Sequence, residues 1–408
     1  MQLVKSLSAL ALLGSAIPST YALSIKDDVV SLSPGVRIQT RATHADANGA
    51  TGNEYRVQSG TDNAVNEPLD FMIRRARLYM NGKYGANWKF SLAINADNVD
   101  AAGTTSSSAA GNSRIVNMRY AWAERTFKMG DDFAHIIHFG LDKPYNNPAD
   151  AGMSSSRELF PTGQVTSVML APRGVGIGYR FTGPMFLFAA DLQNNTNTAR
   201  DVTGTNAQEE EGFFYGARVE IAPSKEWFIA KRAESFVGKE GTGLNLGLSY
   251  GVNDDARTQI GTAPATSDQA VAITAYGADL MFHWNMLSMY AEYRLMNTET
   301  ETVSGAAPST DIDGTGWVVQ AGWAFPLANG SAIEPALRYS QLDLNTDADE
   351  TSVVGSTDIA GSGNQFDIGV NYYIDGHNNK LQLAYQMWEA EEGEGDANII
   401  RLQHQLNF

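Results

Sequence analysis

The chain ends in Ile399-Ile400-Arg401-Leu402-Gln403-His404-Gln405-Leu406-Asn407-Phe408, a stretch in which apolar and polar side chains alternate. Successive side chains of a strand point to opposite sides, so Ile400, Leu402, Leu406 and Phe408 share one face. A closing strand that is apolar on one face, polar on the other and aromatic at its end is typical of bacterial outer-membrane β-barrels. The stretch therefore predicts an all-β protein, a transmembrane antiparallel β-barrel.

The N-terminal segment predicts export. Lys5 precedes an apolar run from Leu7 to Ile17, and Thr20-Tyr21-Ala22 offers small residues at the cleavage positions. A membrane-anchoring helix would need about 18 or more apolar residues, and this run is shorter. Residues 1–22 are therefore predicted to be a signal peptide, and residues 23–408 the outer-membrane barrel.

The composition excludes several classes of protein. The 408 residues include no cysteine, so neither disulfides nor thiolate metal sites are expected to hold the chain together. A formal net charge of −17 argues against nucleic acid as a partner. Hydrophobic residues make up 43%, yet after residue 22 no apolar stretch approaches the length of a membrane-spanning helix. The alternative to a barrel is a soluble periplasmic protein.

From residue 30 onward, alternating segments of about ten residues are separated by short turns and long polar loops. An even strand number places both termini on the periplasmic side, which favours sixteen strands. The predicted strands are 32–43, 69–84, 87–97, 114–128, 134–141, 172–182, 185–194, 211–222, 242–252, 271–283, 287–298, 315–325, 331–344, 363–374, 379–389 and 398–408. We interpret 223–241 as a periplasmic connection that could contain a short helix, not as a further strand.

The two-residue period of each strand assigns one face to lipid and the other to the interior. The predicted lipid-facing sets are Trp88/Phe90/Leu92/Ile94, Val116/Met118/Tyr120/Trp122, Phe213/Tyr215/Ala217/Val219/Ile221, Phe366/Ile368/Val370/Tyr372 and Leu381/Leu383/Tyr385/Met387. Aromatic girdles are predicted from Tyr84, Trp284, Trp317, Trp323 and Trp388. Arg74 interrupts the alternation of its strand and is expected to reach the membrane interface.

The faces opposite the apolar sets carry ten arginines: Arg37, Arg41, Arg75, Arg77, Arg119, Arg180, Arg218, Arg294, Arg338 and Arg401. An arginine facing lipid at the midplane costs about 2–4 kcal/mol, so we expect these to point into water inside the barrel. The other charged residues expected on this wall are Lys83, Lys89, Asp97, Asp142, Asp191, Glu220, Asp279, Glu292, Glu334 and Asp367, which leaves a formal charge of +4. Rings of arginine favour anions. The alternative is that neighbouring opposite charges pair and only keep the wall wet.

A long segment, Lys143 to Ala171, separates the predicted strands 134–141 and 172–182. Its mixture of apolar and hydroxyl residues predicts a third loop that folds inward against the wall and narrows the pore. Arg157 is then a candidate residue at the narrowing. The alternative is an outer loop or a trimer contact.

No pattern indicates an enzyme, a cofactor or a metal site. His135 and His138 fall on opposite faces of one strand, and the six histidines do not suggest a catalytic or metal-binding cluster. Gly174-Val175-Gly176-Ile177-Gly178 lacks the helix that cradling a phosphate requires. Asp311-Ile312-Asp313-Gly314, expected in an acidic outer loop, does not match a full calcium loop.

Several motifs together resemble the phosphate-selective porins of the O/P type. They are Ile73-Arg74-Arg75-Ala76-Arg77-Leu78, Phe139-Gly140-Leu141-Asp142-Lys143-Pro144-Tyr145, Ser154-Ser155-Ser156-Arg157-Glu158-Leu159-Phe160, Ala171-Pro172-Arg173-Gly174-Val175-Gly176-Ile177-Gly178-Tyr179 and Gly369-Val370-Asn371-Tyr372-Tyr373. The resemblance implies a sixteen-stranded trimeric barrel in the outer membrane of a Gram-negative bacterium. It also implies an inward third loop and anion passage through an arginine-lined constriction.

The sequence thus leads us to expect a passive channel for phosphate or small organic anions such as dicarboxylates, surrounded by outer-membrane lipid and lipopolysaccharide. The candidate anion-contacting residues are Arg37, Arg75, Arg77, Arg119, Arg157, Arg180, Arg218, Arg294 and Arg338. Two alternatives stay open: a non-selective or cation-preferring general porin, and a plugged structural or adhesive barrel.

Overall fold

The computed structural model describes most of the strands and part of the connections. The described residues are 25–26, 29–48, 69–99, 116–145, 156–161, 166, 169, 173–194, 213–229, 234–235, 241–259, 268–304, 310–343, 346, 362–390 and 396–408. The predicted signal peptide, residues 1–22, lies outside them.

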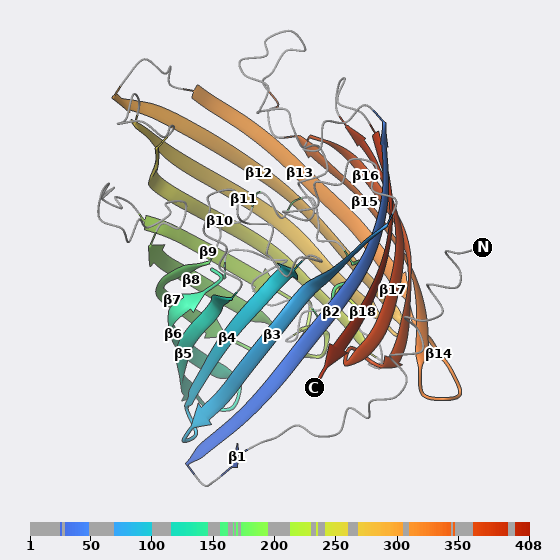
Figure 1. Cartoon of the computed structure of the whole chain (residues 1–408). Coiled ribbons are helices and arrows are strands. Elements are labelled where there is room, and N and C mark those ends of the chain that lie inside the picture. The colour runs from blue at the N-terminus through green and yellow to red at the C-terminus, as the bar shows by residue number, and fades with distance from the viewer. Residues whose placement is uncertain are drawn as a thin grey trace, which may run out of the picture.

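The chain forms a closed antiparallel barrel of 16 strands (Figure 1). Each strand pairs with its neighbours in the sequence, and the last strand pairs with the first long one, as in Gln405 with Gln39. The strands are β2 (Val30–Asn48), β3 (Asp70–Tyr84), β4 (Trp88–Val99), β5 (Asn117–Met129), β6 (Phe133–Asp142), β7 (Gly174–Thr182), β8 (Phe186–Asn194), β9 (Phe213–Ile221), β10 (Thr242–Gln259), β11 (Asp268–Trp284), β12 (Leu287–Ser304), β13 (Thr310–Trp323), β15 (Ala332–Asp343), β16 (Gly363–Asp375), β17 (Asn379–Ala390) and β18 (Asp396–Asn407). Two-residue strands, β1 (Ile25–Lys26) and β14 (Phe325–Pro326), pair at its rim. The predicted fold class is confirmed.

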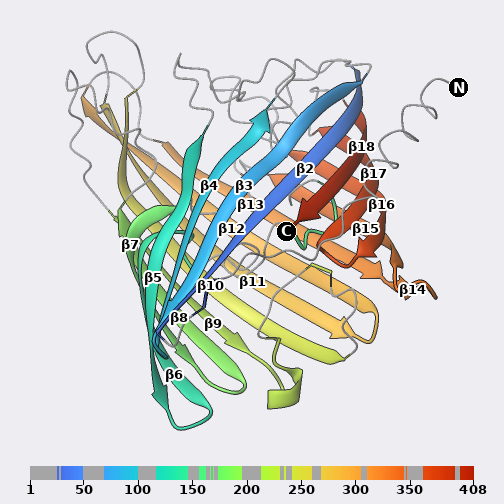
Figure 2. The ribbon, with the colours of Figure 1, turned by 60° about the horizontal axis from the view of Figure 1, so that its bottom comes forward.

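The connections follow the expected alternation of short and long. Tight turns join β3 to β4, β5 to β6, β11 to β12 and β16 to β17 at one end of the barrel, which we call the short-turn end (Figure 2). In the described part of the connection from β9 to β10 there is one 3-10 turn, Lys225–Trp227, which agrees with the predicted connection over 223–241. In the described part of the chain, no helix is long and apolar enough to cross a membrane. Asp311 and Asp313, expected in a loop, belong to β13.

The barrel reverses the usual distribution of polarity. In β15, Glu334, Arg338 and Ser340 point inward and are almost completely buried, whereas Leu337 and Tyr339 alternate with them and are exposed. The same alternation holds in most strands and leaves an apolar outer band, as a lipid-facing surface requires.

The predicted aromatic girdle is correct for most of its members. Tyr84, Trp284 and Trp323 are exposed near strand ends, and Trp317 lies on the outer face beside Tyr339. Trp388 is only 2% exposed, because it shares the inward face of β17 with the buried residues of that strand. The assignment of Trp388 to the girdle is therefore wrong.

Strand β5 departs from strict alternation at Arg119. Its register with β4 shifts there by one residue, so Arg119 is the extra residue of a β-bulge. Beyond the bulge, Tyr120 and Trp122 face the interior, where their rings lie 6.2 Å from that of Tyr79 and 5.1 Å from that of His138. The prediction that Tyr120 and Trp122 face lipid is wrong, because a bulge exchanges the two faces of a strand.

Strand β3 contains a second bulge, at Arg74. Gln39 of β2 pairs with Arg75, but the next residue of β2 pairs with Ile73, so Arg74 is passed over. Its positive charge acts on Glu158, whose pKa it lowers, which puts Arg74 near that carboxylate. The expectation that Arg74 reaches the membrane interface is therefore wrong.

Candidate functional site

The segment 156–161 of the predicted third loop lies against inward-facing side chains of β16 to β18. The Glu158 carbonyl oxygen accepts hydrogen bonds from Lys380 Nζ at 2.8 Å and Gln382 Nε2 at 3.1 Å. The Ser156 carbonyl oxygen accepts one from Gln405 Nε2 at 3.0 Å. A backbone outside regular structure needs such partners when it is buried. The inward amide and ammonium groups of β17 and β18 therefore hold this segment by its backbone.

Two apolar side chains fix the same segment to the wall. Leu159 and Phe160 are fully buried with alanines of β15 and β17. Two glycines provide the space for these side chains. An added Cβ at Gly322 would lie 2.8 Å from Leu159 Cδ1, and one at Gly369 would lie 2.8 Å from Phe160 Cε1. The Arg338 guanidinium lies 4.7 Å from the centre of the Phe160 ring, a cation–π contact.

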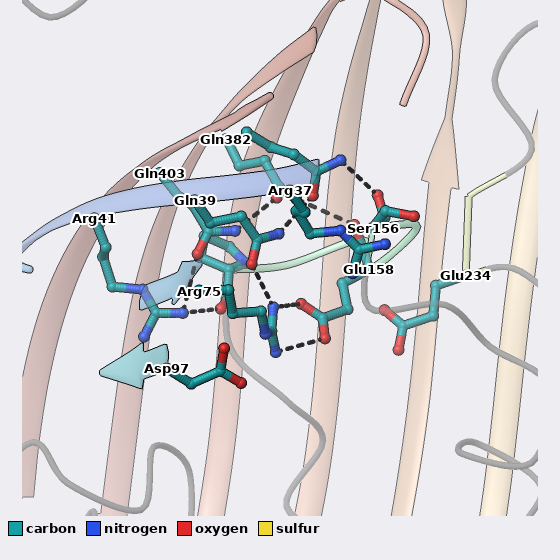
Figure 3. Close-up of polar contacts among 12 residues, drawn as sticks. Arg37, Gln39, Arg41, Arg75, Asp97, Ser156, Glu158, Glu234, Gln382 and Gln403 are labelled. Carbon is teal, nitrogen blue, oxygen red and sulfur yellow. Dashed lines mark hydrogen bonds and ion pairs between the residues drawn. The ribbon is translucent and has the colours of Figure 1, made fainter. Parts of the chain in front are cut away.

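Glu158 brings a carboxylate to β3 (Figure 3). Arg75 Nη1 and Nη2 donate to its two oxygens at 2.7 and 2.9 Å, a bidentate pair. Burial acts to raise the pKa of Glu158, but the charges and hydrogen bonds of Arg75, with Arg74, outweigh burial and hold it below its usual value. Glu158 is therefore a carboxylate at neutral pH.

Asp97 of β4 is the second acid beside these arginines. Arg77 Nε donates to Asp97 Oδ1 at 3.1 Å, and Arg119 Nη1 lies 3.5 Å from Asp97 Oδ2. We call Arg37, Arg74, Arg75, Arg77 and Arg119 the arginine cluster. Its five guanidinium groups and the carboxylates of Asp97 and Glu158 carry a formal charge of +3.

Three of the predicted arginines on the other strands have carboxylate partners close by. Arg218 donates to Glu220 at 2.6 Å and to Asp279 at 2.7 Å, and Arg294 donates to Glu292. Arg338 donates to Asp367 at 2.7 Å. For these arginines, the pairing of neighbouring charges describes the wall.

Arg180 of β7 fastens the start of the long loop. It donates to Glu124 of β5 and to the hydroxyl group of Tyr145, and its guanidinium lies 4.2 Å from the centre of the Tyr145 ring. The backbone N–H of Tyr145 donates to Asp191 at 2.6 Å. Glu124 faces inward because it follows the bulge at Arg119, so the predicted wall charge of +4 omitted it.

Arg157 lies near the turn between β16 and β17, not in the arginine cluster. Burial, then the charges of Lys380 and Arg157, lower the pKa of His377 in that turn to about 3. The residue that reaches the cluster is its neighbour Glu158, which sequence reasoning missed. Arg74 was noticed as a break in the alternation but assigned to the membrane interface, although two adjacent arginines in an alternating strand are a signal for a bulge.

The described residues show no cluster of three histidine or acidic side chains that could hold a metal ion. What the site presents is a set of fixed guanidinium groups, hydrogen-bonded to carboxylates and amides on an inner wall. Such groups can attract and orient anions, and none of them is arranged as a nucleophile beside a base.

Comparison with solved structures gives the same fold. The chain resembles the outer membrane channel DcaP of Acinetobacter baumannii (TM-score 0.54, 12% identity, covering 95% of this chain and 100% of that one). It also resembles OmpT, an outer membrane protein of Vibrio cholerae (0.55, 12%, 95% and 100%), and an anion-selective porin from Comamonas acidovorans (0.53, 11%, 93% and 100%). No curated protein matched the sequence significantly.

A family match extends over nearly the whole chain, residues 46–408. The family is described as phosphate-selective porin O and P. Together with the closed barrel, this match indicates a bacterial outer-membrane channel, not an enzyme. The chain therefore belongs to the phosphate-selective porin O and P family.

Proposed function

We propose that the protein is a passive diffusion channel that prefers anions, and that it selects them where the arginine cluster meets Asp97 and Glu158. The observation that carries the proposal is the excess of guanidinium groups on β2, β3 and β5, to which the bulges at Arg74 and Arg119 each add one. Fixed guanidinium donors replace part of the hydration shell of an anion. Bulges are common where a barrel wall must redirect a side chain.

The attachments of the third loop support a narrowed lumen beside the cluster. Tyr145 is tied to β7 and β8, whereas Ser156 and Glu158 are tied to β17, β18 and β3. These strands lie on different parts of the barrel wall. An inward loop of this kind would bring passing solutes close to Arg75 and Arg119.

The proposed solutes are phosphate and small organic anions such as dicarboxylates, because guanidinium groups bind both through paired hydrogen bonds. We also propose a homotrimer, surrounded by lipid and lipopolysaccharide. One similar structure is described as a trimer form of OmpT (TM-score 0.51), which supports this assembly.

The test is the reversal potential of the purified protein in planar bilayers under a salt gradient, followed by block with phosphate and with succinate. We expect a potential of the sign that anion permeation gives, and the stronger blocker identifies the preferred class of solute. A potential of the opposite sign would overturn the proposal in favour of a cation-preferring or general porin.

A plugged barrel is the second candidate, because one part of the interior is filled. Arg41 donates to the Pro161 carbonyl oxygen and is almost completely buried, like Arg401 nearby. Against a complete plug, the side chains of Lys89 and Arg119 on β4 and β5 are 51% and 18% exposed. An absence of conductance in the same experiment would favour the plugged barrel.

A further inference from the structure

The connection between β9 and β10 enters the barrel from the short-turn end, which is periplasmic in bacterial barrels. Ile229, in the first part of this connection, is held by two backbone hydrogen bonds. Its N–H donates to Asn245 Oδ1 at 2.8 Å, and its carbonyl oxygen accepts from Asn245 Nδ2 at 3.0 Å. Its side chain is buried against Met281, Tyr290 and Val318, on the inner faces of β11, β12 and β13. The connection is thus attached to the inner wall beyond its own two strands.

Ser235, later in the same connection, is attached still further round the barrel. Its hydroxyl group donates to Glu334 of β15 at 2.9 Å, and its oxygen lies 3.0 Å from the hydroxyl oxygen of Tyr373 of β16. Its carbonyl oxygen lies 3.2 Å from Nε2 of His377. Since β11, β12 and β13 separate β10 from β15, Ser235 and Ile229 are held by different parts of the inner wall.

Glu234 joins this connection to the third loop. One carboxylate oxygen of Glu234 accepts the backbone N–H of Leu159 at 2.7 Å. The residue before Leu159 is Glu158, the bidentate partner of Arg75, and Figure 3 shows Glu158 between Arg75 and Glu234. A continuous series of contacts therefore runs from Ser235 to the arginine cluster.

A shared wall residue ties the two inserted segments together. Asn371 Nδ2 donates to the Leu159 carbonyl oxygen at 2.9 Å and to Glu334 at 3.2 Å. Glu334, in turn, accepts from Ser235 and from Tyr373. A buried carboxylate with three donors is a rigid anchor, because losing any donor leaves part of its charge unsatisfied.

We propose that Glu234 and Ser235 form a periplasmic brace that holds segment 156–161 in place, so that Glu234 is a positioning residue for the arginine cluster. The proposal deepens the proposed function and rests on it only for the selectivity measurement. Without the brace, Leu159 loses the acceptor of its N–H, and Glu158 is held less firmly against Arg75.

The brace needs a hydrogen-bond acceptor at residue 234 more than it needs a negative charge. Burial raises the pKa of Glu234, and although the Leu159 N–H lowers it, the nearby charge of Glu158 adds to the rise. Arg338 of β15 and Gln320 of β13 face the same carboxyl group and favour its ionised form. Glutamine keeps an acceptor oxygen of the same reach, so Glu234→Gln is the conservative variant and Glu234→Ala the disruptive one.

The first experiment compares these two variants with Lys225→Ala, a control in the same connection whose side chain is 62% exposed. We expect Glu234→Ala to increase open-channel current noise and to lower the anion-to-cation permeability ratio by roughly twofold. Glu234→Gln and Lys225→Ala should match the wild type. Wild-type noise and selectivity in Glu234→Ala would overturn the brace. A wild type without anion preference would overturn the proposed function instead. The open-channel current noise of Glu234→Ala would then be the test of the brace.

A second experiment remains decisive if Glu234→Ala fails to fold. The chain has no cysteine, so Ser235→Cys introduces a single thiol, and Lys225→Cys is its exposed control. In folded protein we expect the thiol at 235 to react with a maleimide about tenfold or more slowly than the thiol at 225, because buried groups react only after local opening. Equal rates would show that residue 235 is not held inside the barrel and would overturn the brace.

Discussion

Two parts of the inner wall, β2 to β5 and β9 to β12, both carry buried arginines but differ in their balance of charge. On β2 to β5, the arginine cluster with Asp97 and Glu158 has a formal charge of +3. On β9 to β12, the charged residues named in the site are Arg218, Arg294, Glu220, Asp279 and Glu292, with a formal charge of −1. An excess of arginine over carboxylate, not the number of arginines, therefore distinguishes a candidate anion site from a self-paired wall.

The hydrogen bonds of one arginine from each wall illustrate this difference. Arg218 directs Nε, Nη1 and Nη2 to carboxylate oxygens of Glu220 and Asp279, and it is only 2% exposed. Arg119 lies at the long distance of 3.5 Å from Asp97, which it shares with Arg77. The first arginine stabilises the wall, whereas the second is less firmly paired, and its side chain is 18% exposed.

The largest effect that we predict is on stability, for Arg218→Ala. It leaves Glu220 and Asp279 buried without their cation, and breaking a buried pair in this way costs about 3–5 kcal/mol. Urea unfolding in detergent, followed by heat-dependent gel mobility, measures the loss. Selectivity of the folded fraction should stay the same. Near wild-type stability would mean that the β9 to β12 wall does not depend on its pairs.

Arg119→Ala should act in the opposite way. It reduces the formal charge of the cluster and its acids from +3 to +2, so we expect the anion-to-cation permeability ratio to fall by roughly threefold, with little loss of stability. Arg125→Ala is the matched control on the same strand, because Arg125 is exposed on the outer face beside Trp88 and Phe127. An equal effect of both substitutions would contradict a specific role for Arg119.

Most of the barrel could be predicted because its periodicity is a consequence of lipid outside and water inside. The strand ends of β3, β9 and β16 agree with the predicted ones to within about two residues. Period-2 reasoning failed where the period itself changes. The bulge at Arg119 turned Tyr120 and Glu124 inward, and no residue pattern in β5 announces it.

The inserted segments could not be predicted in detail for a different reason. Their contacts join residues far apart in the sequence, such as Glu158 with Arg75 and Ser235 with Glu334. Composition indicated that the third loop suits the inside of a barrel, but it did not indicate which of its charged residues meets the cluster. The structure brings Glu158 there, and the chosen candidate, Arg157, lies near His377.

Acid should change the charge of the arginine cluster and its acids only below the pH range in which a glutamate usually titrates. Arg75 holds the pKa of Glu158 below its ordinary value of 4.5, so its contribution to stability is present above that value and is lost as pH falls through the lowered pKa. We expect constant anion selectivity between about pH 7 and pH 5.

Glu158→Gln should imitate the acid form by raising the formal charge to +4 and strengthening block by phosphate. Weaker block would mean that Glu158 serves the site by fixing Arg75.

The smallest effects come from adding one methyl group to each wall. An added Cβ at Gly369 would lie 2.8 Å from the Phe160 ring, so Gly369→Ala should displace the segment that carries Glu158. An added Cβ at Gly247 would meet the guanidinium of Arg218 and the carboxylate of Asp279. Overpacking of this kind costs about 1–3 kcal/mol at either position.

These two glycine variants distinguish the two walls, because the expected loss of stability is similar for both and the expected effect on permeation is not. Gly369→Ala should alter conductance and phosphate block, since Phe160 is two residues from Glu158. Gly247→Ala should lower the urea midpoint and leave permeation unchanged, since Arg218 faces its own carboxylates. If both variants altered permeation equally, the two walls would act as one electrostatic surface, and the local balance of arginine and carboxylate would not be what selects the solute.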